Sequence, residues 1–313
     1  MALAVAPLQA QNQTWDNGSA NSLWDTSSLN WDVGSAWSNG NNAIFGDTGS
    51  GNITLGEDIT AGDVSFVNNN SSIDYIFAGS NLTFNSNIST SGSGNITINN
   101  LLAGPGSINL NGSGNFVLTS NNFTQNNTFT GSITVGPGAI LSTHLTTFSN
   151  GNLFSVLGDT TKATAVTVLD GGTFSIRSGN FTHYGNASIK LTGNGVITNG
   201  TASFGALRNA AQSVFTDQID LTGNTTFGGI NGITINGNLN VSGSNVTLTK
   251  IGGTTLTLRG SHNNVTAANL SRIIVNGASL FLGTDVAAAN ATIVLDGTGA
   301  GLGGYGRERE HCQ

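Results

Sequence analysis

Charged side chains, cysteine and proline are all scarce in this chain of 313 residues. Lys, Arg, Asp and Glu make up only 8% of it, whereas ordinary soluble domains contain roughly 25%. The one cysteine, Cys312, excludes an internal disulfide. Only three prolines are present, which excludes a proline-rich spacer.

Positive charge is especially sparse. The nine Lys and Arg residues form no stripe, and the formal net charge is −7. A protein that binds nucleic acid needs a concentrated basic patch or stripe. The sequence therefore predicts that nucleic acid is not a partner.

Long apolar runs are absent as well. No stretch of 18 apolar residues occurs, so no transmembrane segment is predicted in this chain. Residues 1–11 form a short apolar run that stops at the small residue Ala10, as the end of a secretory signal does. They are predicted to be the remnant of a secretion signal or a disordered arm.

The chain is rich in glycine, asparagine, serine and threonine, with apolar residues in alternation. This composition, with 45 glycines, disfavours helices. Segments such as 53–55, 82–84 and 233–235 place an apolar residue at every second position, which defines one buried face of a strand. Helical structure is expected only as a turn or two at 202–213, 266–271 and 286–290.

Two stretches repeat one arrangement of short strands and glycine turns. Residues 114–141 and 250–283 both read as strand, polar turn, strand, glycine turn and short strand. A unit of this size cannot bury its own apolar face and must stack on its neighbours. The fold class predicted for residues 49–300 is therefore all-β, a parallel β-helix or β-solenoid.

Stacked coils should also bring equivalent side chains about 4.8 Å apart, so asparagines at the corners can hydrogen-bond from coil to coil. Some of Asn121, Asn122, Asn126, Asn127, Asn263 and Asn264 are expected to lie at such corners.

All four tryptophans precede the regular region, in residues 12–48. An open solenoid end would expose its core, so this segment is predicted to be a Trp-rich N-terminal cap. The alternative is a glycan contact built from exposed rings of Trp15, Trp24, Trp31 and Trp37. At the other end the alternation stops, and residues 301–313 are predicted to be a disordered or truncated tail.

Residues that could perform chemistry are isolated from one another. Glycoside cleavage needs two carboxyl groups at a fixed separation, and a spacing of three puts Asp217 and Asp220 on opposite faces of a strand. Stacking can still gather residues one coil apart, and the residues to inspect are Asp170, Arg177, Lys190, Asp217 and Asp220. The histidines lack the spacing of zinc ligands. No catalytic, metal-binding or cofactor-binding residue is predicted, and the chain is not expected to be an enzyme.

The two repeated units resemble the autotransporter-associated β-strand repeat found in bacterial surface proteins. The matching residues in the first copy are Gly112, Gly114, Leu118, Asn121, Asn122, Phe129, Thr130, Gly131, Gly138 and Leu141. Those in the second copy are Lys250, Gly252, Gly253, Leu256, Leu258, Gly260, Asn276, Gly277 and Leu280. The resemblance implies a secreted, right-handed β-helix that serves as a stalk, a spacer or an adhesive surface.

The function predicted from these observations is that of a non-enzymatic β-solenoid acting as stalk, spacer or adhesin. Its expected location is extracellular or on the bacterial cell surface, in association with the outer membrane. Its expected partners are surface glycans or the surface of a host or neighbouring cell. The alternative is a β-helix protein that binds or cleaves carbohydrate in a groove lined by aromatic side chains.

Overall fold

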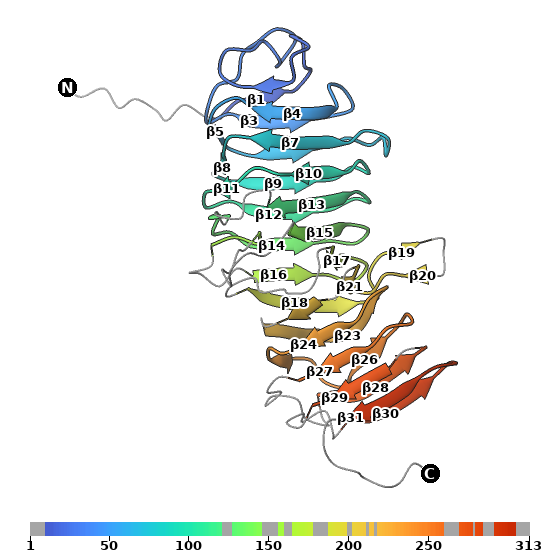
Figure 1. Ribbon diagram of the computed structural model, residues 1–313. Coiled ribbons are helices and arrows are strands. Elements are labelled where there is room, and N and C mark those ends of the chain that lie inside the picture. The colour runs from blue at the N-terminus through green and yellow to red at the C-terminus, as the bar shows by residue number, and fades with distance from the viewer. Residues whose placement is uncertain are drawn as a thin grey trace, which may run out of the picture.

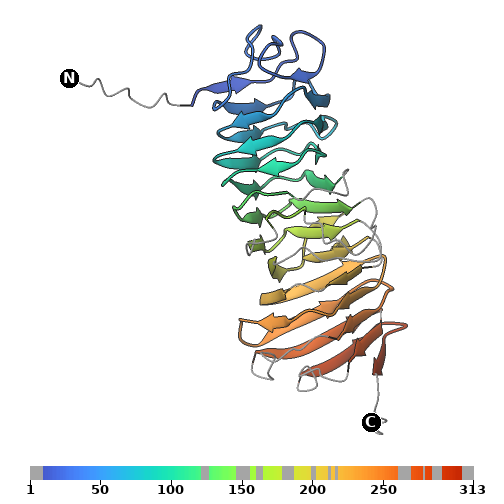
Figure 2. The ribbon, with the colours of Figure 1, turned by 60° about the vertical axis from the view of Figure 1, so that its left-hand side comes forward.

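The computed structural model describes most of the chain as one stack of short strands. The described residues are 10–120, 127–145, 156–159, 165–177, 187–198, 202–210, 213–215, 218–259, 269–277, 279–283 and 291–304. The strands lie side by side in an elongated stack, with β1 at one end and β30 and β31 at the other (Figure 1). The same stacking is seen from a second direction in Figure 2.

Three parallel ladders run along the stack. The first contains β1 (Asn12–Thr14), β3 (Asn42–Phe45), β6 (Val64–Phe66), β9 (Asn87–Thr90), β12 (Ser107–Leu110), β14 (Ile133–Val135), β16 (Ala165–Val168), β18 (Ser188–Gly193), the first part of β23 (Gln218–Gly229) and β25 (Leu239–Val241). The second contains β2 (Leu23–Trp24), β4 (Gly51–Leu55), β7 (Tyr75–Gly79), β10 (Ile96–Ile98), β13 (Asn115–Ser120), β15 (Ile140–Leu145), β17 (Thr173–Ile176), β21 (Leu207–Asn209), the last part of β23, β26 (Val246–Lys250), β28 (Leu270–Asn276) and β30 (Thr292–Asp296).

The third ladder is in two pieces. One piece is β5 (Ile59–Ala61), β8 (Leu82–Phe84) and β11 (Leu102–Ala103). The other is β22 (Ser213–Phe215), β24 (Ile233–Ile235), β27 (Leu256–Leu258), β29 (Ser279–Leu282) and β31 (Gly301–Gly304). A separate antiparallel hairpin is formed by β19 (Ile197–Thr198) and β20 (Ala202–Ser203).

This architecture confirms the predicted all-β, parallel β-solenoid. No helix occurs within the described residues. The ladders already begin in the segment 12–48, because β1 pairs with β3 and β2 pairs with β4. The right-handed sense of the coil stays a prediction.

The core consists of inward side chains stacked in register from coil to coil. In the first ladder Phe45 lies on Phe66, with ring centroids 5.2 Å apart, and further along Val135 lies opposite Val168. In the second ladder Phe116, Leu141 and Phe174 follow one another in register. Full burial of such a side chain stabilises the fold by roughly 1.5–3 kcal/mol. The stabilisation from apolar burial therefore increases with the number of coils.

Polar side chains add coil-to-coil hydrogen bonds at the corners. Asn127 accepts a bond from the Leu102 amide at 2.9 Å and donates one to the Val156 carbonyl at 2.7 Å, and so bridges neighbouring coils as predicted. The other five corner asparagines, Asn121, Asn122, Asn126, Asn263 and Asn264, lie outside the described residues. Comparable bonds tie Asp58 to the Asn81 amide and Asp63 to the Asn87 amide, both at 2.9 Å.

Two sequence predictions differ from the structure. The described residues of the helical turn expected at 202–213 form strands instead, namely β20, β21 and the start of β22, and the turn expected at 286–290 lies outside the described residues. Here Leu207 must stack on Phe174 in register, and this packing outweighs the local preference of an alanine-rich segment. The predicted tail at 301–313 begins with a strand, because the backbone of β31 pairs with β29 and Leu302 lies opposite Leu280.

Candidate functional site

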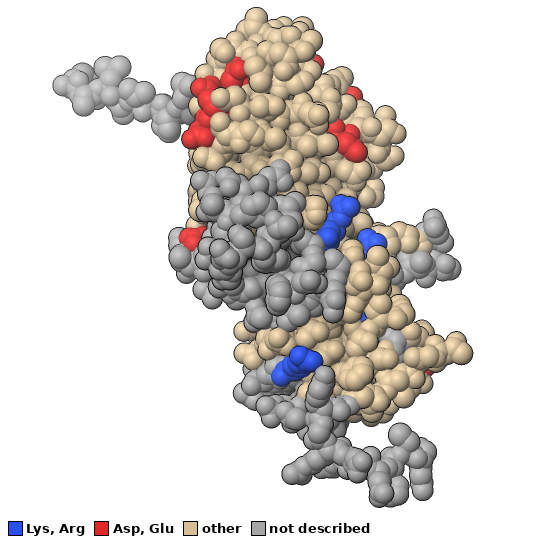
Figure 3. Space-filling model, viewed as in Figure 1, with Lys and Arg blue, Asp and Glu red and all other residues tan. Residues whose placement is uncertain are grey.

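Charge is unevenly distributed along the stack. Eight of the 16 acidic residues lie within the first 74 residues, where there is no Lys or Arg, and all nine Lys and Arg follow residue 161. Figure 3 shows this on one face, with acidic side chains toward the N-terminal end and basic side chains further down. The two halves of the stack therefore present different electrostatic surfaces.

The acidic residues of the N-terminal half serve as hydrogen-bond acceptors within the fold. Asp47 accepts a bond from the Asn70 amide at 3.3 Å, and Asp74 accepts one from the Asn95 amide at 3.0 Å. Asp25 binds Ser27 and Ser28. Burial alone would raise the pKa of Asp25, but the hydrogen bonds from the Ser28 and Ser27 amides and hydroxyls bring it below its usual value. The carboxylates of Asp25, Asp47 and Asp74 therefore have a structural role, as acceptors of hydrogen bonds from neighbouring residues.

The four tryptophans lie inside the N-terminal end of the stack. Trp24 packs against Trp31, Trp37 and Phe45 with ring centroids 5.2–5.4 Å apart, and none of the four indoles is more than 3% exposed. The structure contradicts the glycan contact predicted for Trp15, Trp24, Trp31 and Trp37, because a ring that stacks on a sugar must present a face to solvent. Their burial against Phe45 is the arrangement that a cap requires.

The candidate catalytic residues that the structure describes do not form a paired-carboxylate site. Register places Lys190 opposite Asp220, and the next residues along this row are Thr167 and Asn240. Asp220 accepts a bond from the Ser242 hydroxyl through one oxygen at 3.1 Å, while its other oxygen is buried without a hydrogen-bond partner. This row therefore offers one acid and one amine.

The remaining candidates are dispersed. Asp170 is exposed and accepts a bond from the Asn194 amide at 3.3 Å, and Asp217 lies outside the described residues. Arg177 is exposed at the end of β17, beside Arg208. His144 is exposed on β15, and His183, His262 and His311 lie outside the described residues. Within the described part of the chain, no three His, Cys, Asp or Glu residues are placed to hold a metal ion.

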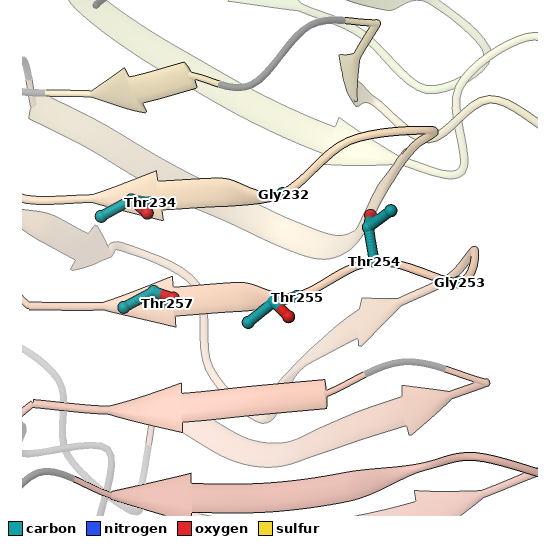
Figure 4. A pocket seen from close by; sticks show the side chains of 6 residues that line it. All are labelled: Gly232, Thr234, Gly253, Thr254, Thr255 and Thr257. Atoms are coloured by element: carbon teal, nitrogen blue, oxygen red, sulfur yellow. The ribbon is translucent and has the colours of Figure 1, made fainter. Parts of the chain in front are cut away.

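A shallow hollow of about 420 Å³ lies on the outer face of the third ladder. Figure 4 shows the residues that line it, which come from β24, β27 and the turns before them. They are Gly232, Thr234, Gly253, Thr254, Thr255 and Thr257. The hollow exists because two of these positions have no side chain, and a Cβ built on Gly253 would meet nothing within 4 Å.

The described residues that line the hollow carry only neutral groups. Thr234 and Thr257 lie opposite each other in register, and the Thr254 hydroxyl donates to the Asn231 carbonyl at 2.8 Å. Threonine hydroxyls can orient a polar ligand by hydrogen bonds, but no lining residue can act as a general acid or base at neutral pH. This part of the surface can therefore bind but has no group for hydrolysis.

Lys250 occupies a position that the sequence motif did not reveal. It lies in the inward row of the second ladder, between Phe227 and Val275, and is fully buried. Its ammonium group donates to the Ile251 carbonyl, and burial lowers the pKa of Lys250 from 10.5 to about 8. The alternation of Val246, Leu248 and Lys250 along β26 was the signal that it points inward.

Comparison with known proteins finds an adhesin. The chain is 31% identical over 236 residues to the BmaC autotransporter adhesin of Brucella suis biovar 1 (strain 1330). The match covers 69% of this chain but only 6% of the adhesin, so the chain corresponds to a small part of that protein's length. No family model matches the chain and no solved structure matches it, and the resemblance to the specific β-strand repeat stays a prediction.

In the part of the chain that the structure describes, no helix is long and apolar enough to cross a membrane.

Proposed function

We propose that this chain is part of a bacterial surface protein of the autotransporter type, and that it acts as a stalk and an adhesive surface without catalytic activity. The observation that carries the proposal is the 31% identity over 236 residues to an autotransporter adhesin. The corresponding location is extracellular or at the outer membrane.

The fold is well suited to a stalk. Neighbouring coils are hydrogen-bonded through long parallel ladders, and inward side chains such as Phe116, Leu141, Phe174 and Leu207 stack in register. A load along the rod is therefore shared by backbone hydrogen bonds and core packing in every coil. Growth by added coils lengthens such a rod without changing its cross-section.

The outer surface is suited to adhesion rather than catalysis. It is rich in neutral hydroxyl and amide groups, and charged residues make up only 8% of the chain. In the row that contains Asp220, its neighbours are Lys190 and Asn240, so no second carboxylate lies directly beside it in register. This arrangement supports binding by many weak polar contacts.

Surface display of the 313-residue chain on a non-adherent bacterium tests the proposal. Bacteria that carry it should adhere to at least one surface in a panel of glass, polystyrene and cultured animal cells. Their numbers should exceed those of bacteria that display an unrelated protein of similar charge and size. If the bacteria that display the chain adhere no better than the control bacteria on any surface, the chain is not an adhesin and only the role of a spacer remains.

A second assay addresses catalysis. The purified chain, incubated with neutral and acidic polysaccharides, should release neither reducing ends nor unsaturated products. Turnover that scales with protein concentration and disappears in Asp220→Asn would show that the chain is an enzyme and would overturn the proposal.

A further inference from the structure

Two arginines lie next to each other on the outer face of the second ladder. β17 and β21 are parallel neighbours, and their register places Ser175 opposite Arg208. Arg177 follows directly after β17, and its amide still bonds to the Thr143 carbonyl of the preceding coil at 3.0 Å. Arg177 is thus two residues beyond Ser175 on the same face, the diagonal position within reach of long side chains.

The two guanidinium groups are not neutralised within the described structure. Among the described residues, no carboxylate forms an ion pair with Arg177 or Arg208, and the contact of Arg208 is with the Phe204 ring, 4.0 Å from its centroid. Burial, and then the charge of Arg177, lower the pKa of Arg208. A neighbouring positive charge lowers the pKa of a cationic group, so the effect of Arg177 on Arg208 agrees with their closeness. In a chain of net charge −7, a pair of adjacent uncompensated cations needs an explanation.

A third group in the same row lacks a partner. The Ser175 side chain is only 1% exposed, and its hydroxyl has no hydrogen-bond partner. Buried hydroxyl groups are normally hydrogen-bonded, because burial of an unpaired one costs free energy. Ser175 lies directly opposite Arg208 but is covered, so the groups that a polymer can reach at this place are the two guanidinium groups.

The regular coil is interrupted beside these residues. The β19–β20 hairpin lies between β18 and β21 in the chain and projects from the side of the stack near β21 (Figure 1). Phe204, which contacts Arg208, follows the hairpin directly. Insertions in repeat proteins often form the binding face.

We propose that Arg177 and Arg208 bind the carboxylate or sulfate groups of an acidic polysaccharide. A guanidinium group matches an oxyanion with two parallel N–H donors. The proposal rests on the adhesive role above and names the chemistry of its ligand.

A polysaccharide fits this surface better than a nucleic acid does. Tight binding to nucleic acid draws on many phosphate contacts, but along this row the positions on either side of Ser175 and Arg208 are Ser142 and Gly228.

The test measures the affinity of the full chain for four immobilised polymers. They are heparin as a sulfated chain, polygalacturonate as a carboxylated chain, dextran as an uncharged chain and double-stranded DNA as a polyanion without carboxylate or sulfate. Binding to heparin or polygalacturonate is expected, with no binding to dextran. Arg177→Gln and Arg208→Gln together should weaken binding at least about tenfold, because each removes charge-assisted hydrogen bonds.

Two further variants serve as controls. Arg272→Gln removes an exposed arginine from β28 in the same ladder and should leave the affinity unchanged. Ser175→Ala should leave both the affinity and the thermal unfolding midpoint unchanged, because the hydroxyl is buried and has no partner to lose.

Other results would overturn the site. Equal losses in Arg272→Gln and the double variant would show diffuse electrostatic attraction. Binding to DNA as tight as that to the polysaccharides would show a general polyanion site, and an absence of binding to any polymer would remove the site. Bacteria that display the double variant but still adhere like wild type, together with unchanged polymer binding, would refute this inference while leaving the adhesive role intact.

Discussion

The carboxylate of Asp74 accepts two hydrogen bonds from Asn95 on the next coil, one from its backbone amide and one from its side-chain amide, both at 3.0 Å. The relay continues, because the Asn95 amide oxygen accepts a bond from the Asn115 backbone at 3.2 Å. Asn115 in turn accepts one from the Ser142 hydroxyl at 2.7 Å. Side chains on the outer corner therefore join successive coils in addition to the backbone ladders.

Removal of the first member of this relay should weaken the coils it joins. Asp74→Ala is expected to lower the free energy of unfolding by about 1 kcal/mol, because two hydrogen bonds lose their acceptor. Asp74→Asn keeps an acceptor oxygen and should cost less. Denaturant unfolding followed by circular dichroism measures both, and identical midpoints for Asp74→Ala and wild type would contradict this role.

The buried amine of Lys250 predicts a stability that depends on pH. Its pKa is lowered in the folded state to about 8, so between pH 8 and 10.5 the unfolded chain binds more protons and stability rises with pH. Below pH 8 both states are protonated, and the penalty for the buried charge is present in full. Unfolding at pH 7.5 and pH 9.5 should show the protein more stable at the higher pH.

Lys250→Met tests the origin of that effect. The variant should be more stable than wild type at pH 7.5 and should lose the rise with pH, since a similar volume remains without the charge. Tyr75 cannot cause the rise, because burial, with the charge of Asp47, raises the pKa of its phenol above the usual value. A group whose pKa is raised in the folded state makes stability fall as the pH increases. A rise that persists in Lys250→Met would assign the effect to another group.

The tryptophan cluster should stabilise the N-terminal end. Trp24→Ala is expected to cost about 3–5 kcal/mol, because it leaves a cavity among Trp31, Trp37 and Phe45. Val33→Ser is the matched control, since Val33 is 94% exposed. Hydrogen exchange of the first coils should accelerate in Trp24→Ala alone, and unchanged protection there would refute the capping role.

One turn glycine should be intolerant of any side chain. Gly104 has φ of +108°, and a Cβ there would lie 2.3 Å from the Phe84 carbonyl oxygen of the coil below. Gly104→Ala should lower the thermal midpoint clearly, through both backbone strain and overlap. Gly253→Ala meets nothing within 4 Å and should have little effect. Equal midpoints for the two variants would contradict the close approach of the coils at Gly104.

The alternation of side chains was sufficient to predict which residues face the core. Thr234 and Thr257, each central in an apolar-Thr-apolar triplet, point outward as that pattern requires. For Lys250 the two sequence signals disagree, because alternation predicts that the side chain faces the core while its charge predicts that it faces solvent. In the structure Lys250 faces the core, in register between Phe227 and Val275.

The contacts between coils could not be predicted in the same way. Phe77 pairs with Ile98, whereas Ile176 pairs with Asn209 across a longer connection that contains the β19–β20 hairpin. Because the number of residues per coil varies, sequence spacing alone does not place Arg177 beside Arg208 or Lys190 opposite Asp220. The burial of the tryptophans was likewise undecided, since a cap and a sugar platform have the same composition.

The measurement that most directly tests an adhesive, non-catalytic surface follows mass on a quartz-crystal sensor. The sensor carries surface material from the cells or support to which the displaying bacteria adhere, and the purified chain flows over it. The account predicts that mass rises as the chain binds and returns to its starting value when the chain is eluted with salt. A final mass below the starting value would show that the layer had been cleaved, and an absence of any gain would show that this chain does not adhere.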